Sequence, residues 1–165
     1  MCRPETAGDQ RPVFDVNRLA FGREDEARLV DSLRDGGYVR LSLVAEIGGL
    51  VVGHILFSEL PIITPEGTTL ALALAPMAVV PEWQRQGVGS ELVRQGLAAC
   101  REQDHRIVIV LGHPRFYPRF GFSAELARRL DSPYAGEAFM AVELAENALD
   151  GVSGNVQYPP PFAAL

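Results

Sequence analysis

The centre of the chain constrains the fold most, because two apolar runs flank one amphipathic helical pattern. Residues 70–80 alternate alanine with leucine, which are good helix formers, but Pro76 interrupts this run and favours a buried strand with a local kink or bulge. Residues 87–103 carry apolar side chains on one helical side, and residues 107–111 form a β-branched run typical of a strand buried on both faces. The order strand, helix, strand predicts two parallel neighbours joined by a right-handed crossover.

Shorter patterns on either side extend this unit into a mixed α/β fold. Before it we expect two helices, a strand hairpin and a proline-containing loop, at residues 13–20, 24–34, 41–57 and 60–69. After it we expect a short helical segment and two strands, at residues 114–120, 139–144 and 154–158.

Length and composition exclude several classes of protein. The 165 residues predict a single domain over residues 1–165, and an apolar fraction of 47% excludes global disorder. A net charge of −6 without a basic run argues against nucleic acid as a partner. No apolar stretch approaches the ~20 residues of a membrane span and no secretory signal is visible, so we expect a cytoplasmic protein that does not bind membranes. Cys2 and Cys100 are too few for a zinc cluster, and no metal is expected.

The loop that precedes the long helical pattern carries the strongest chemical signal. Gly87 and Gly89 allow backbone N–H groups to approach a ligand closely, and the helix N-terminus adds unpaired donors with partial positive charge. Arg85 adds a cation. The spacing matches neither G-x-x-x-x-G-K-[ST] nor G-x-G-x-x-G, which removes support from ATP hydrolysis and hydride transfer. The loop predicts a phosphate-binding site, with an ordinary strand-to-helix turn as the alternative.

This loop resembles the [Arg/Gln]-x-x-Gly-x-[Gly/Ala] motif of the GNAT superfamily of acetyl-CoA-dependent N-acetyltransferases, through Gln84, Gly87 and Gly89. Residues 76–79, Pro-Met-Ala-Val, are similar to the fourth strand of that family. Residues 116–122 are similar to its aromatic-Tyr-x-x-x-Gly-Phe segment. The three segments occur in the family's order, and the wider resemblance, to a bacterial branch of predicted acetyltransferases, covers essentially the whole chain.

The resemblance implies a GNAT-like α/β fold: a mixed, mostly antiparallel central sheet with a splayed parallel strand pair, flanked by helices. It also implies acetyl-CoA as cosubstrate, with the pyrophosphate on the loop amides and the pantetheine arm and thioester carbonyl on a bulged strand. The residues that it implies in cofactor binding are Met77, Ala78, Val79, Gln84, Arg85, Gln86, Gly87, Val88, Gly89 and Ser90.

Tyr117 is the candidate catalytic residue. The departing CoA thiolate needs a proton, and a phenol with a pKa of ~10 can supply one when it is held close. Tyr117 lies four residues before Gly121, as in the family segment, and the alternative is a core tyrosine. The amine must lose a proton, and the base is left open among water, Glu46, His54, Glu59 and His113.

We therefore expect an enzyme that moves an acetyl group from acetyl-CoA directly to a primary amine of a small molecule or peptide. The alternative is an acyl-CoA-binding or sensing module with little turnover. Glu24, Asp25 and Glu26 suit either the positive end of a helix or the recognition of a cationic amine. The sequence leaves open the acceptor, a preference for longer acyl-CoA and the formation of a homodimer.

Overall fold

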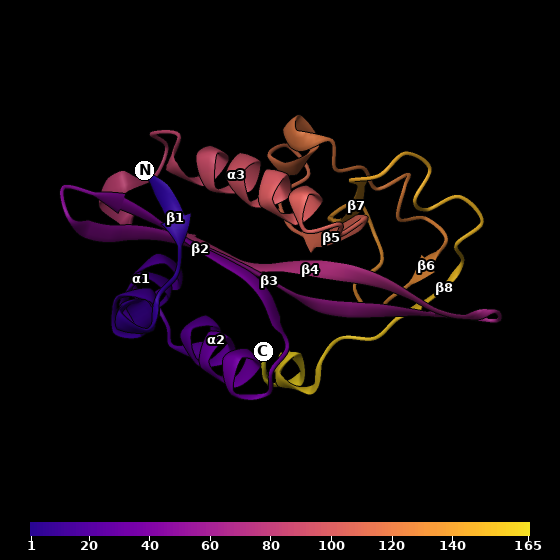
Figure 1. Ribbon diagram of the computed structural model, residues 1–165, viewed down its shortest axis with the longest axis horizontal. Coiled ribbons are helices and arrows are strands. Elements are labelled where there is room, and N and C mark those ends of the chain that lie inside the picture. The colour runs from indigo at the N-terminus through magenta and orange to yellow at the C-terminus, as the bar shows by residue number, and fades with distance from the viewer.

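The computed structural model describes residues 1–165 and shows a central sheet between two helical layers (Figure 1). The sheet has the order β1-β2-β3-β4-β5-β7, and β8 pairs with both β3 and β6. The strands are β1 (Cys2–Pro4), β2 (Val39–Ile47), β3 (Leu50–Thr64), β4 (Gly67–Val79), β5 (Ile107–Leu111), β6 (Leu130–Asp131), β7 (Phe139–Glu143) and β8 (Gly154–Val156). The helices are α1 (Gln10–Phe21), α2 (Asp25–Asp35) and α3 (Val88–Glu102), with 3₁₀ turns η1 (Ala7–Asp9), η2 (Pro81–Trp83), η3 (Tyr117–Phe120) and η4 (Pro160–Ala164).

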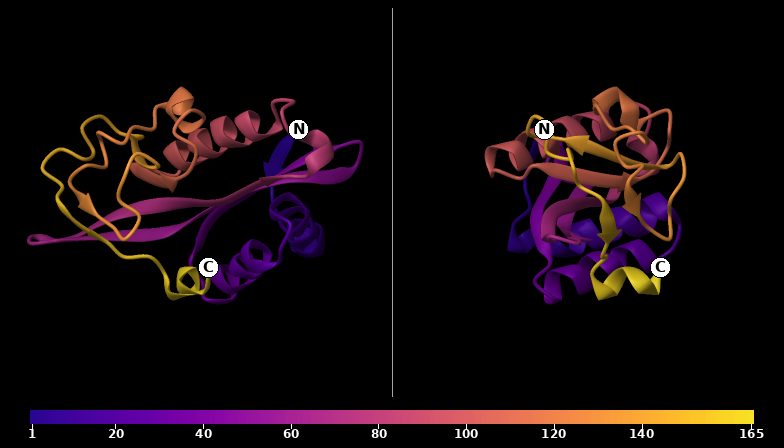
Figure 2. Two further views of the ribbon diagram at one scale, coloured as in Figure 1. Left: turned by 180° about the vertical axis from the view of Figure 1, so that it is seen from behind. Right: turned by 90° about the vertical axis from the view of Figure 1, so that its right-hand side faces the viewer.

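Each face of the sheet buries one apolar cluster. Helix α3 covers one face, while α1, α2 and η4 cover the other (Figure 1 and the right-hand view of Figure 2). The predicted apolar side of α3 packs on the sheet, where its Leu92 meets a cluster that includes Phe57. On the opposite face, Leu33 of α2 and Leu56 of β3 belong to the second cluster. No helix is both long enough and apolar enough to cross a bilayer.

The predicted parallel pair is confirmed. Strands β4 and β5 are parallel neighbours, as are the short β6 and β8, and every other pairing is antiparallel. Pairing of β4 with β5 covers only Leu72 to Leu74 of β4, which continues to Val79 beside β3 alone. Between the pairs Ile55–Met77 and Phe57–Leu74 the register shifts by one residue, so β4 carries the bulge predicted at Pro76.

The prediction of a loop at residues 60–69 is wrong, because this segment is the distal half of the β3–β4 hairpin. Prolines and a glycine suggested a loop, but the carbonyl of Pro61 accepts a hydrogen bond from the backbone N–H of Gln157, away from β4. The N and the C=O of one strand residue point to the same side, so the missing N–H of Pro61 removes no bond between β3 and β4. The turn itself needs only residues 65–66.

Candidate active site

A cavity of about 1130 Å³ lies where β4 and β5 part. Its lining includes Tyr117 and Val79 from the apolar cluster under α3, and Leu29 and Phe162 from the cluster under α1 and α2. The cavity therefore reaches both faces of the sheet. This volume is slightly above the range of about 300–1,000 Å³ for small-molecule sites, and it leaves room for more than one ligand group.

The loop between β4 and α3 presents the N-terminus of α3 to the cavity. Gly87 is the residue before the first helical turn and has φ +88°, a left-handed conformation that glycine adopts without strain. The side-chain amide of Gln84 donates to the carbonyl of Val79 at 2.8 Å, which ties the loop to the end of β4. The N–H groups of the first helical turn have no intrahelical partner and can bind an anion.

Most of the predicted cofactor residues line this cavity. They are Met77, Ala78, Val79, Gln84, Arg85, Gly87, Gly89 and Ser90. The other two are turned elsewhere: the amide of Gln86 donates to the carbonyl of Glu82 at 2.9 Å, and the side chain of Val88 faces Gly53 of β3. Any contribution of Gln86 and Val88 to binding is thus limited to their backbone groups.

Tyr117 lies in η3 and lines the cavity, although only 7% of the residue is exposed. Its ring makes edge contacts with Phe116 and Phe122, at centroid distances of 5.0 and 5.6 Å. It also lies against the backbone at the end of β5, since a Cβ at Gly112 would come within 2.3 Å of the ring. Burial raises the pKa of the phenol to about 12, so Tyr117 is protonated at neutral pH and can act as an acid.

Of the four side chains considered as the base, the structure brings only His113 to the cavity. Glu46 accepts a hydrogen bond from Arg3 at 2.8 Å, and Glu59 is paired with Arg40. Both of these carboxylates lie on strands outside the lining of the cavity.

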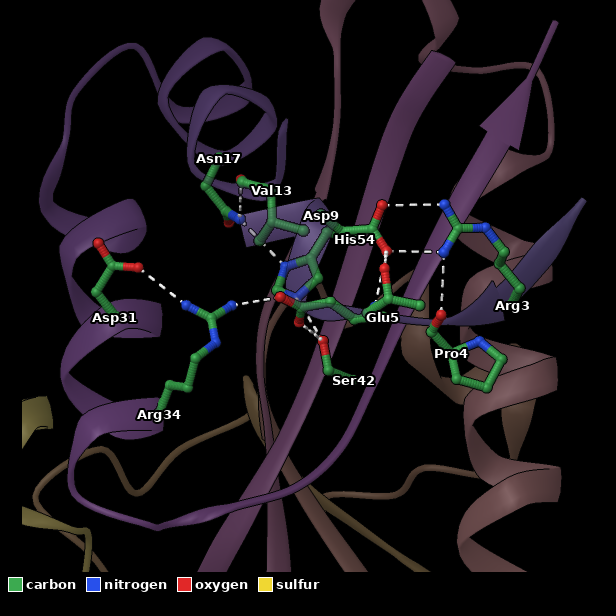
Figure 3. Close-up of polar contacts among 11 residues, drawn as sticks. Arg3, Pro4, Glu5, Asp9, Val13, Asn17, Asp31, Arg34, Ser42 and His54 are labelled. Atoms are coloured by element: carbon green, nitrogen blue, oxygen red, sulfur yellow. Dashed lines mark hydrogen bonds and ion pairs between the residues drawn. The ribbon is translucent and has the colours of Figure 1, made fainter. Parts of the chain in front are cut away.

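His54 is fully buried in a polar network between α1 and the sheet (Figure 3). The amide of Asn17 donates to the carbonyl of Val13 at 3.0 Å and to Nδ1 of His54 at 3.1 Å, so Nε2 carries the imidazole proton toward Oγ of Ser42, 3.0 Å away. Burial, with a smaller contribution from Arg34, lowers the pKa of His54 to about 3. The neutral imidazole therefore holds α1 on β2 and β3, and it is outside the cavity.

The half of the cavity on the α1–α2 face contains residues that the sequence patterns missed. Tyr158 makes edge contacts with Tyr134 and Phe162, at centroid distances of 5.4 and 5.2 Å, and all three line the cavity. Glu26 also lines it, and each of its carboxylate oxygens accepts a hydrogen bond from Arg23. That guanidinium lowers the pKa of Glu26. Glu26 belongs to the acidic start of α2, for which the sequence gives recognition of a cationic amine as one alternative, whereas the aromatic residues are isolated and give no periodic signal.

A mostly antiparallel sheet whose central parallel pair parts beside a glycine-containing helix N-terminus defines the class of GNAT acetyltransferases. A family model described as an acetyltransferase (GNAT) domain matches residues 2–124, and the chain belongs to this family. The resemblance stated from the sequence is confirmed.

Relatives of known structure cover nearly the whole chain. The chain is 38% identical over 168 residues to YhbS of Escherichia coli strain K12, named an uncharacterized N-acetyltransferase, with 98% of each chain covered. It superposes on YhbS from Escherichia coli in complex with CoA with a TM-score of 0.91 and 33% identity, covering 99% of this chain and 91% of that one. A GNAT family acetyltransferase from Brucella melitensis in complex with acetyl-CoA gives a TM-score of 0.83 and 32% identity, with 98% and 97% covered.

Proposed function

We propose that this acetyltransferase moves an acetyl group from acetyl-CoA directly to a primary amine. The observation that carries the proposal is the cavity at the β4–β5 parting, which joins the N-terminus of α3 to Tyr117 and continues through the sheet. The two relatives with CoA and acetyl-CoA bound support acetyl-CoA as the cosubstrate.

The donor would bind along β4 and the start of α3. The N–H groups of residues 88–90 suit the pyrophosphate, and Arg85 adds a positive charge at the lining. The carbonyl of Val79 points away from β3 to Gln84, so the N–H of Val79 points away from β3 as well, toward the cavity. This N–H is our candidate donor to the thioester oxygen, where negative charge develops.

The amine, an ammonium ion in solution, first gives up one proton to water or to His113, which lines the cavity. The neutral nitrogen then attacks the thioester carbon, a C–N bond forms, the nitrogen loses a second proton to water, and the C–S bond breaks. The leaving thiolate takes the phenolic proton of Tyr117, which recovers a proton from solvent. The products are an N-acetyl amide and the CoA thiol, and no acyl-enzyme is formed.

Replacement of Gly87 by valine tests the donor site. A Cβ at Gly87 would meet no atom within 4 Å, so the variant acts through the backbone, which a β-branched residue cannot hold at φ +88° without strain. We expect the dissociation constant of acetyl-CoA, measured by calorimetry, to rise about tenfold or more. Gly48→Val is the matched control, because Gly48 has φ +58° and equally open space in the β2–β3 turn, outside the cavity lining.

Two results would count against the proposal. An unchanged affinity of the Gly87 variant for acetyl-CoA would remove the loop from the donor site. Tight binding of acetyl-CoA by the wild-type protein, without thiol release in the presence of any primary amine, would favour an acyl-CoA-binding or sensing module instead.

A further inference from the structure

The α1–α2 half of the cavity is apolar and aromatic. Leu29 of α2, Ala73 of β4 and Ile109 of β5 line it from the buried cluster on that face of the sheet. Tyr158 and Phe162 close it from the C-terminal segment, which Figure 1 shows returning beside α2. The small side chain of Ala73 leaves space over the sheet that a flat or branched apolar group could fill.

Charge is distributed unequally between the two halves of the cavity. The arginines of the lining, Arg85 and Arg119, belong to the loop before α3 and to η3, on the cofactor face. The α1–α2 half has one ionised side chain in its lining, Glu26, which is 7% exposed. Its carboxylate accepts one hydrogen bond from Arg23 on each oxygen, and about two of its roughly four lone-pair sites are left for another donor.

This distribution discriminates between classes of acceptor. A carboxylate or phosphate on the acceptor would enter an apolar chamber, the α1–α2 half of the cavity, whose lining holds Glu26 and no cation. The neighbouring Arg23 is already paired with Glu26, so burial of the anion is costly. A polyamine would bring several ammonium groups to a single carboxylate that Arg23 already neutralises in part. A small hydroxylated amine would leave the aromatic walls without a contact.

We propose that the acceptor is a primary amine on an apolar or aromatic body that carries no acidic group. The body packs against Tyr158 and Phe162, and Glu26 attracts the cationic amine into the chamber. This assignment rests on the proposed acetyl transfer and adds the substrate class to it.

Thiol release from acetyl-CoA with closely matched amines tests the acceptor class. 2-Phenylethylamine is compared with phenylalanine, which adds only a carboxylate, with ethanolamine, which lacks the apolar body, and with spermidine, a polyamine. We expect kcat/KM for 2-phenylethylamine to exceed each of the other three by about tenfold or more, as an apolar pocket discriminates by groups of this size.

Two variants link that preference to the chamber. Glu26→Gln should raise KM for 2-phenylethylamine about tenfold with little change in kcat, whereas Glu24→Gln, which removes an exposed partner of Arg28 on the same helix, should not. Tyr134 is 40% exposed, so Tyr134→Ala should fold, and it should raise KM for 2-phenylethylamine but not for ethanolamine.

Acetyl-CoA binding, measured separately by calorimetry, distinguishes the two levels of the proposal. If acetyl-CoA binds but phenylalanine, ethanolamine or spermidine is preferred, or 2-phenylethylamine releases no thiol, the acceptor class is wrong and the donor site stands. Equal effects of the Glu24 and Glu26 variants would also overturn it. If acetyl-CoA does not bind, the proposed function itself fails.

Discussion

Mild acid should destabilise the protein through His54. In the folded protein burial and Arg34 lower the pKa of this histidine to about 3, against 6.5 for an exposed histidine. Because the folded pKa is the lower one, the unfolded chain takes up the proton first: the stabilisation is fully present above pH 6.5 and is lost as the pH falls toward 3. Each pH unit in that window costs about 1.4 kcal/mol, so about 2 kcal/mol should be lost by pH 5.

The groups around the imidazole explain why no neighbouring charge stabilises the protonated form of His54. Oε1 of Glu5 is 3.9 Å from Nε2 of His54, but Glu5 is paired with Arg34 and accepts the hydrogen bond of Ser42 (Figure 3). A proton on Nδ1 would also point at the amide nitrogen of Asn17. Both groups would then be donors, and their hydrogen bond would be lost. Protonation therefore breaks the network of hydrogen bonds that holds α1 on the sheet.

Urea unfolding at pH 7, 6 and 5 measures this effect, with His54→Gln as a variant that cannot titrate but keeps an amide donor near Ser42. Carboxylates whose pKa is lowered in the folded state, such as Asp9 and Glu26, lose their contribution only as the pH falls below their ordinary values of 3.8 and 4.5. The wild type should lose about 2 kcal/mol more than the variant between pH 7 and pH 5. Equal losses in the two proteins would refute the reasoning.

Three further substitutions have defined outcomes. Tyr117→Phe should lower kcat about 10²–10⁴-fold in steady-state kinetics while the affinity for acetyl-CoA hardly changes, and a near-normal kcat would make Tyr117 a packing residue. Gly112→Ala places a Cβ 2.3 Å from the Tyr117 ring and should lower both Tm and kcat, and an unchanged kcat would show that the ring position does not matter. Gly96→Ala places a Cβ 2.6 Å from the ring of Phe57. Overpacking costs about 1–3 kcal/mol and should outweigh the gain of about 1 kcal/mol in helix propensity, so Tm should fall. A raised Tm would contradict this packing.

The strand–helix–strand centre of the chain could be predicted because the secondary-structure propensities of its residues agree with their packing in the fold. Residues 107–110 are β-branched and buried in a strand between β4 and β7, and Gly87 before α3 has a left-handed conformation that glycine adopts without strain. Propensity and packing act in the same direction at both places. The loop that resembles the GNAT motif could therefore be located from the sequence to within a residue of where α3 begins.

The aromatic wall of the α1–α2 half of the cavity could not be predicted, because it comes from segments without periodicity. Tyr134 lies in a turn, Tyr158 in irregular structure and Phe162 in η4, and Tyr158 follows β8, which pairs with the distal half of β3. The sequence also predicts a loop for that half of β3, because of Pro61, Pro65 and Gly67. A strand tolerates proline at a position whose backbone N–H would not bond to a neighbouring strand. The sequence alone does not show whether the backbone at residue 61 faces β4 or points away from it.

The family model ends at residue 124, and part of the cavity lining lies beyond this boundary. The loop before α3, the β4 bulge and Tyr117 all precede it, whereas Tyr134, Tyr158 and Phe162 follow it. The proposed donor site and the aromatic part of the proposed acceptor wall therefore occupy successive stretches of the chain, while Glu26 and Leu29 line the acceptor side from within the region that the family model matches. A change confined to the C-terminal stretch would thus alter the proposed acceptor wall and leave the residues of the proposed donor site in place.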